Sequence, residues 1–123
     1  MAIKELLKNT IEGTGEVTES LASTVTSILK EGTEDVGEIF GAIVELGKEG
    51  VIDITEGVKD VYVGAVKALE ESGKNTEEAI GEVATKAEKA LGKVVKGGEE
   101  ATGEAIKKGI EEAKGIVEAP FKP

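Results

Sequence analysis

The chain has 123 residues, of which 39% are hydrophobic and 33% charged, with 17 Gly and a net charge of −10. It contains no Cys, His or Trp, which excludes disulfides, thiol or imidazole catalysis and a metal site built on soft ligands. All 15 basic residues are Lys. Because nucleic acid binding needs a basic patch that neutralises phosphates, we expect no nucleic acid partner. We also expect no cofactor.

The N-terminal segment carries charges at Lys4, Glu5 and Lys8, so it lacks the apolar centre of a secretory signal. The longest uncharged apolar run is Ile39 to Val44, far shorter than the roughly 20 residues that span a bilayer. We therefore predict a cytoplasmic protein. A position at the periphery of a membrane or granule surface stays open.

An eleven-residue repeat runs along the whole chain. Counting from Ile3, the positions at offsets 0, 3, 4 and 7 of each eleven-residue step are uncharged throughout. Eleven residues complete three helical turns, at about 3.67 residues per turn, so such positions share one face of an α-helix. The pattern predicts an all-α fold: a long amphipathic helix, or a helical hairpin, with hendecad periodicity.

The large apolar side chains of this repeat form a candidate interaction stripe. We expect it to pack on other helices or on an apolar surface, because a helix with this much Gly is stable only in an assembly or on such a surface. The stripe residues are Ile3, Leu7, Val25, Ile28, Leu29, Val36, Ile39, Phe40, Ile43, Val51, Val58, Val61, Tyr62, Val66, Leu69, Ile80, Val83, Leu91, Val94, Val95, Ile106 and Ile110.

Small residues border the stripe on both sides and favour close helix–helix packing. One border carries Gly15, Gly37, Gly81, Gly92 and Gly103, and the other carries Gly57, Ala68, Ala79, Ala90 and Ala101. Between residues 36 and 69 the helix is apolar nearly all round, since Leu46, Ile52 and Val63 lie off the stripe. We expect this stretch to be the most deeply buried part.

Four segments are candidate breaks in the helix: Glu12–Gly15, Lys48–Gly50, Ser72–Thr76 and Gly97–Gly98. The third is the best candidate for a hairpin turn, because Gly73 can stop a helix and Asn75 can cap the next one, with Glu78 three residues later. Against a turn, the eleven-residue register continues across it. A continuous helix and a hairpin at 72–76 therefore both stay open.

The chain forms a single repeat region, 1–123, with two chemical halves and a tail at 119–123 that Pro120 and Pro123 keep from being helical. Residues 1–73 hold six Lys and fifteen acids, whereas residues 74–123 hold nine Lys and ten acids. Catalytic motifs are missing. Gly13-Thr14-Gly15 lacks the third Gly of a dinucleotide fingerprint. Among the many acidic residues, which are candidate catalytic carboxylates, only Glu77, Glu88 and Glu99 lie at the edge of the apolar stripe. We expect no enzyme activity.

Two segments resemble the repeat core of the synucleins, namely Gly47-Lys48-Glu49-Gly50-Val51 and Ile54-Thr55-Glu56-Gly57-Val58. The wider pattern is similar to group 3 late-embryogenesis-abundant proteins, perilipins and exchangeable apolipoproteins. The resemblance implies a helix that forms on lipid or on another apolar surface. Synuclein repeats carry Lys at the polar border, whereas this chain is acidic there.

Several functions fit these observations. The first is a non-catalytic structural or scaffold protein whose helices form a homo-oligomer or pack on partner helices as a coiled coil. The second is a coat on a lipid, membrane or granule surface, of synuclein or perilipin type. The third is a stress-protective protein, and the fourth is an accessory subunit of a larger complex.

Overall fold

The computed structural model describes residues 3–13, 20–32 and 35–118, and these ranges form an all-α fold. They contain six helices packed into a bundle. The helices are α1 (Ile3–Glu12), α2 (Leu21–Glu31), α3 (Val36–Lys48), α4 (Ile54–Glu71), α5 (Thr76–Lys96) and α6 (Glu100–Glu118). None of them is long and apolar enough to cross a bilayer.

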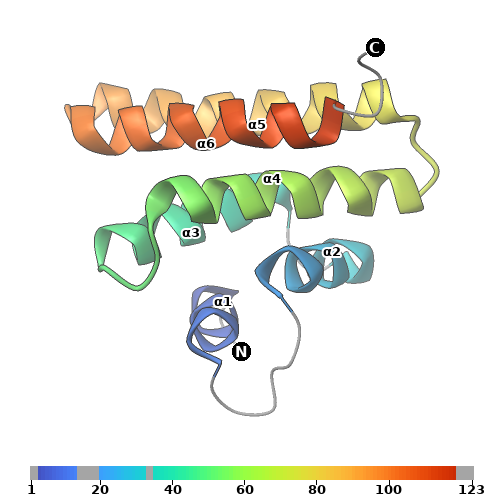
Figure 1. The fold of residues 1–123 in the computed structure, drawn as a ribbon, viewed down its shortest axis with the longest axis horizontal. Helices are drawn as coiled ribbons and strands as arrows, with labels where there is room; N and C mark the ends of the chain where they lie inside the picture. Colours follow the sequence, from blue (N-terminus) through green and yellow to red (C-terminus); the bar gives the residue numbers. More distant parts are fainter. Residues whose placement is uncertain (1–2, 14–19, 33–34, 119–123) are drawn as a thin grey trace.

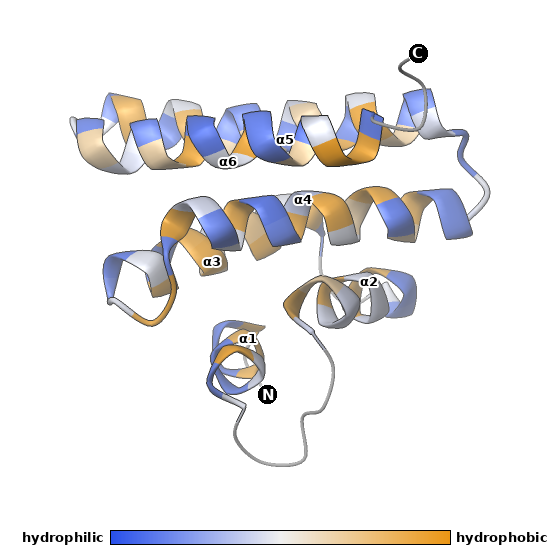
Figure 2. Cartoon of the chain, viewed as in Figure 1, coloured by the Kyte–Doolittle hydropathy of each residue, from blue (hydrophilic) through white to orange (hydrophobic). Residues whose placement is uncertain are grey.

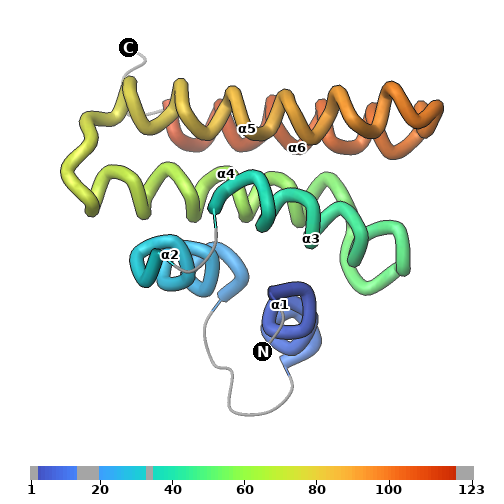
Figure 3. Tube along the Cα trace, turned by 180° about the vertical axis from the view of Figure 1, so that it is seen from behind, coloured from blue at the N-terminus to red at the C-terminus, as the bar shows by residue number. Residues whose placement is uncertain are grey.

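The helices lie in three layers, with α4 in the middle (Figure 1). The long α5 and α6 lie side by side and cover one side of α4, while α2 packs on the opposite side. Figure 3 shows from behind that α3 runs beside α4 in the middle layer and that α1 lies below α3, seen nearly end-on. Helix α4 therefore contacts α2, α3, α5 and α6, which explains why it needs apolar or small residues on several faces.

Polar side chains begin four of the helices by accepting hydrogen bonds from backbone N–H groups three residues later. Such caps satisfy donors that the first helical turn leaves free. The N-caps are Ser20 before α2, Asp35 before α3, Asp53 before α4 and Asn75 before α5. The last three are each followed at the third position by Glu, a signal that the sequence interpretation used only at Asn75.

Glycines with positive φ angles end five helices: Gly13, Gly32, Gly50, Gly73 and Gly98. Only Gly adopts this left-handed backbone without steric cost. At three of these turns, a backbone N–H beyond the Gly bonds to a carbonyl five residues earlier, as from Lys74 to Leu69 at 3.1 Å. The chain therefore turns at all four predicted breaks, and also at Gly32.

The prediction of one long helix or a single hairpin is wrong. The α4–α5 turn does lie at 72–76, with the cap at Asn75 and the left-handed Gly73, but it is one of several turns in the described ranges. The expectation that the stripe needs an outside surface also changes, because other segments of the same chain cover it. The predicted tail at 119–123 lies outside the described residues.

The core is centred on α3 and α4. Among the largest side chains with almost no exposed surface, Tyr62, Phe40, Ile39, Ile43, Leu46, Val58 and Val61 all belong to these two helices. Leu46 lies off the predicted stripe and is fully buried, while Ile52 and Val63 are partly buried against the core. The stretch that is apolar nearly all round is thus the centre of the fold, where α4 is enclosed by four other helices.

Candidate functional site

The predicted interaction stripe forms the hydrophobic core of the bundle, with one exception. Its buried members are Leu7, Val25, Ile28, Val36, Ile39, Phe40, Ile43, Val58, Val61, Tyr62, Val66, Val83, Val94, Ile106 and Ile110. Its partly buried members, which pack against that core, are Ile3, Leu29, Val51, Leu69, Ile80 and Leu91. Val95 is 60% exposed. Figure 2 shows the resulting mixture of hydrophobic and hydrophilic faces along each helix.

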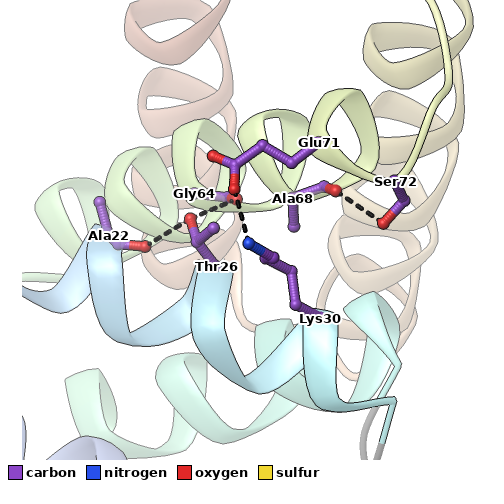
Figure 4. Close-up of polar contacts among 7 residues, drawn as sticks. All are labelled: Ala22, Thr26, Lys30, Gly64, Ala68, Glu71 and Ser72. Atoms are coloured by element: carbon purple, nitrogen blue, oxygen red, sulfur yellow. Dashed lines mark hydrogen bonds and ion pairs between the residues drawn. The ribbon is translucent and has the colours of Figure 1, made fainter.

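Helices α2 and α4 cross with their backbones in close approach. The Thr26 hydroxyl lies 2.8 Å from the carbonyl of Gly64 in α4 and 3.0 Å from the carbonyl of Ala22 in its own helix (Figure 4). A Cβ atom added at Gly64 would lie only 2.4 Å from the Ala22 carbonyl oxygen. This crossing therefore requires Gly at position 64, and neither Gly64 nor Thr26 lies on the predicted stripe.

Helices α4 and α6 meet in a similar way. A Cβ atom at Gly109 would lie 2.7 Å from the Thr55 carbonyl oxygen and 2.9 Å from Cβ of Val58. The Thr55 hydroxyl in turn donates a hydrogen bond of 3.0 Å to the Ala105 carbonyl. Small residues and Thr hydroxyls thus allow α4 to be enclosed at short distance from both sides.

The two small-residue borders of the stripe have different surroundings. On one border, Gly57, Ala68 and Ala79 are buried, whereas Ala90 is half-buried and Ala101 is exposed, so only part of this border lies between helices. On the other, Gly81 and Gly92 of α5 are exposed, and nothing lies within 4 Å of the position that a Cβ would take. This second border is free of contact along much of α5.

Tyr62 is the largest fully buried side chain, and its hydroxyl has no hydrogen-bond partner among the described residues. Its pKa is raised from 10.0 to about 12, mainly because the buried phenolate would lose its hydration, with smaller contributions from the carboxylates of Glu118 and Glu88. A hydroxyl buried without a partner costs free energy. The tyrosine therefore serves as packing at a cost in stability.

Exposed ion pairs join the helices at the surface. Lys30 of α2 contacts Glu71 of α4 at 2.8 Å, and its hydrogen bond lowers the pKa of Glu71 (Figure 4). Lys48 of α3 contacts Glu99 at 2.6 Å, so one of the acids at the stripe edge forms an ion pair. Pairs of this kind at a solvated surface contribute little to stability each.

No cluster of three or more acidic side chains suited to a metal ion occurs in the ranges that the structure describes. The two other acids at the stripe edge, Glu77 and Glu88, are exposed. The candidate site is therefore the stripe itself, an apolar face folded inward.

Comparisons of the chain with protein-family models, with curated proteins and with solved structures give no match.

Proposed function

We propose that this is a non-catalytic protein that coats an apolar surface such as a lipid layer. In this proposal the bundle is the stored form. On the surface the turns straighten, and the stripe becomes one continuous face of a long helix that lies in the interface.

The register of the buried residues carries this proposal. Ile28 in α2, Ile39 in α3, Val61 in α4, and Val83 and Val94 in α5 are all buried, and each is separated from the next by a multiple of eleven residues. A bundle does not require this, because a turn of any length can follow each helix. A continuous helix does require it, since eleven residues return to the same face.

The turns are compatible with such opening. Each positive-φ glycine that ends a helix is also able to adopt helical angles. Each would cost about 1 kcal/mol relative to Ala within a helix, so burial of the stripe has to stabilise the open form. The bundle and the surface then compete for the same apolar residues.

The charge distribution favours a neutral surface over an anionic one. Residues 1–73 carry six Lys and fifteen acids, which anionic headgroups would repel. We therefore expect binding to vesicles of phosphatidylcholine, and weaker binding when an anionic lipid is added.

Opening can be measured between two surface positions that form an ion pair in the bundle. Lys30 and Glu71 lie 2.8 Å apart at their charged atoms, but in one continuous helix they would be about 60 Å apart, at 1.5 Å per residue. The chain has no Cys, so spin labels on a K30C/E71C variant report this distance alone. We expect a short distance in solution and a long one on vesicles. A short distance at saturating vesicles would contradict opening.

Insertions in the α4–α5 turn test the register directly. Ser72, Gly73 and Lys74 are exposed, so two residues inserted after Gly73 should leave the bundle intact. In a continuous helix the same insertion rotates the second half of the stripe by about 200°, at about 100° per residue. We expect vesicle affinity to fall for the two-residue insertion and to be kept for an eleven-residue insertion. Equal affinity of both would show that the register is not used.

Self-association is a second candidate, supported by the outer surface of α5 and α6. Val95 is 60% exposed and Ile116 50% exposed, and Gly81 and Gly92 leave space for a neighbouring helix. Sedimentation equilibrium over a concentration range tests it. An increase in mass that V95K removes would support it, whereas a monomer at every concentration would exclude it.

A further inference from the structure

A groove with a volume of about 510 Å³ runs between α3 and α5, separate from the α2–α4 and α4–α6 crossings. Its floor is apolar: Val44 of α3 and Val94 of α5 are buried there, and Ala90 is half-buried. Gly37 and Gly41 of α3 form part of its wall. Nothing lies within 4 Å of the position that a Cβ of Gly41 would take, so the missing side chain leaves the groove open.

Charged residues border this floor. Lys86, Lys89 and Lys93 of α5 line one side of the groove. Their spacing of three and four residues places them in one row, about 10 Å long at 1.5 Å per residue. Within the described part of the chain no carboxylate lies within ion-pair distance of any of the three. These three side chains give one side of the groove a local positive charge in a protein of net charge −10.

The acidic side of the groove is different, because Asp35 is engaged in the fold. Its Oδ1 accepts a hydrogen bond of 2.8 Å from the backbone N–H of Glu38 and caps α3. Asp35 and Glu38 lie at one end of the groove, at the first turn of α3, while the lysines continue past Ala90 toward Val94. Lys86 lies beside Gly37 at this acidic end, so Lys89 and Lys93 are the lysines further from the acids.

We infer that this groove binds one molecule of a single-chain anionic amphiphile, a fatty carboxylate. The alkyl chain would cover Val44, Ala90 and Val94, and the carboxylate would lie against the lysine row. The volume falls within the range of small-molecule sites, about 300–1,000 Å³. Both parts of the ligand match the lining, since a simple anion would not contact the apolar floor and a neutral alkane would not pair with the lysines. The inference does not depend on opening of the bundle.

The overall negative charge of the protein makes a preference for anionic over cationic amphiphiles informative. A net charge of −10 repels anions and attracts cations at long range, although about 0.15 M salt limits this effect to roughly 8 Å. An anionic amphiphile that binds more tightly than its cationic counterpart must therefore be held by nearby lysines.

The test is a titration of the full chain with decanoate in 0.15 M NaCl, followed by backbone amide resonances. We expect saturation at one decanoate per chain, with shifts concentrated at Gly41, Val44, Ala90 and Val94. We expect decyltrimethylammonium, which has the same alkyl chain and the opposite charge, to bind at least fivefold more weakly. Absence of saturation, or tighter binding of the cation, would overturn the inference.

Charge variants separate the groove from the general field of the protein. K89Q/K93Q removes two lysines of the row, and K107Q/K108Q removes two exposed lysines of α6, with the same change in net charge. We expect K89Q/K93Q to weaken decanoate binding by roughly fivefold or more, since each exposed pair contributes modestly. The α6 variant should change it little. Equal weakening by the two variants would contradict the site.

A glycine variant tests the shape of the groove. G41L places a side chain in the open space above the floor, and G81L is its matched control, because Gly81 is also exposed, helical and without neighbours within 4 Å. We expect G41L to abolish saturable binding and G81L to retain it, with both variants folded by circular dichroism. If G41L does not fold, the comparison of K89Q/K93Q with K107Q/K108Q still tests whether decanoate binds in the groove.

The K30C/E71C distance separates this inference from the proposed surface coating. Saturation with a short distance supports the groove, even if vesicles never open the bundle. If decanoate lengthens the distance, it acts on the stripe, and the groove is excluded while surface coating is supported.

Discussion

The hydroxyl of Thr26 in α2 donates a hydrogen bond of 2.8 Å to the backbone carbonyl of Gly64 in α4, 38 residues further along the chain (Figure 4). The bond is buried and occurs where the backbones of α2 and α4 come close together, because Gly64 has no side chain to separate them. A helix–helix contact in this fold thus depends on a missing Cβ and on one hydroxyl, in addition to apolar packing.

The first prediction concerns Gly64. G64A should destabilise the bundle by about 1–3 kcal/mol, because the new Cβ would lie 2.4 Å from the Ala22 carbonyl oxygen and α2 would have to shift. G81A is the matched control: it lies in the interior of α5 with open space around it, so it should stabilise by up to about 1 kcal/mol. Urea unfolding measures both. A neutral or stabilising G64A would show that the crossing is looser than described.

The second prediction concerns the Thr26 hydroxyl. T26V keeps the shape of the side chain and removes its hydrogen bond to Gly64, so we expect a loss of about 0.5–1.5 kcal/mol in the free energy of unfolding. T85V is the control, because Thr85 is exposed and its hydroxyl bonds only to Gly81 within the same helix. If both variants lose the same free energy of unfolding, the loss reflects helix propensity, and the hydrogen bond at the α2–α4 crossing does not contribute to stability.

The third prediction concerns the buried hydroxyl of Tyr62. Y62F should leave stability unchanged or raise it by about 1 kcal/mol, because it removes a buried group without a partner among the described residues. Thermal or urea unfolding measures the change. A clear loss of stability in Y62F would mean that the hydroxyl does have a hydrogen-bond partner.

The raised pKa of Tyr62 predicts how stability depends on alkaline pH. The folded pKa of about 12 lies above the ordinary value of 10.0, so the folded state holds this proton more tightly. Its contribution is complete below about pH 10 and is lost as the pH rises toward 12, at up to about 1.4 kcal/mol per pH unit. Lys4 and Lys74, whose pKa values are raised by Glu49 and Glu82, add to the decline. The difference in stability between wild type and Y62F, measured as a function of pH, isolates the contribution of the tyrosine. Parallel curves of stability against pH would contradict a raised pKa of Tyr62.

The fourth prediction concerns the ion pair between α2 and α4. The hydrogen bond from Lys30 lowers the pKa of Glu71, so this pair stabilises the fold above the ordinary Glu pKa and is lost as the pH falls through the lowered value. In K30Q the Glu71 pKa should return toward its ordinary range, whereas the exposed K96Q serves as a control without effect. Carboxyl resonances followed during a pH titration give the pKa of Glu71 in each variant. An unchanged Glu71 in K30Q would rule out the pair in solution.

Much of the local structure was predictable because it depends on neighbouring residues. A left-handed Gly and an Asn, Asp or Ser cap act within one turn of the chain, so the breaks near Gly13, Gly50, Gly73 and Gly98 follow from the sequence. The turn at Gly32 follows the same rule and was missed, although Asp35 and Glu38 form the same cap signal that marks Asn75.

The candidate groove was not predictable, because its two walls come from distant parts of the chain. Lys86 and Gly37 are 49 positions apart, and only the packing of α3 against α5 brings them together. The eleven-residue pattern placed Gly37 and Ala90 on opposite borders of one helix, and it therefore gave no indication that they line the same groove.

The sequence by itself determined that the chain is helical, where most helices end and which face supplies most of the buried residues, since these properties follow from backbone preferences and apolar periodicity. Only the tertiary structure decided what covers the stripe. A repeat of eleven specifies a face but does not specify its partner, and a second chain, a lipid surface or the chain itself would bury it equally. In this structure, helices of the same chain approach closely enough to bury the stripe. The close contacts of Gly64 with Ala22 and of Gly109 with Thr55 make this approach possible.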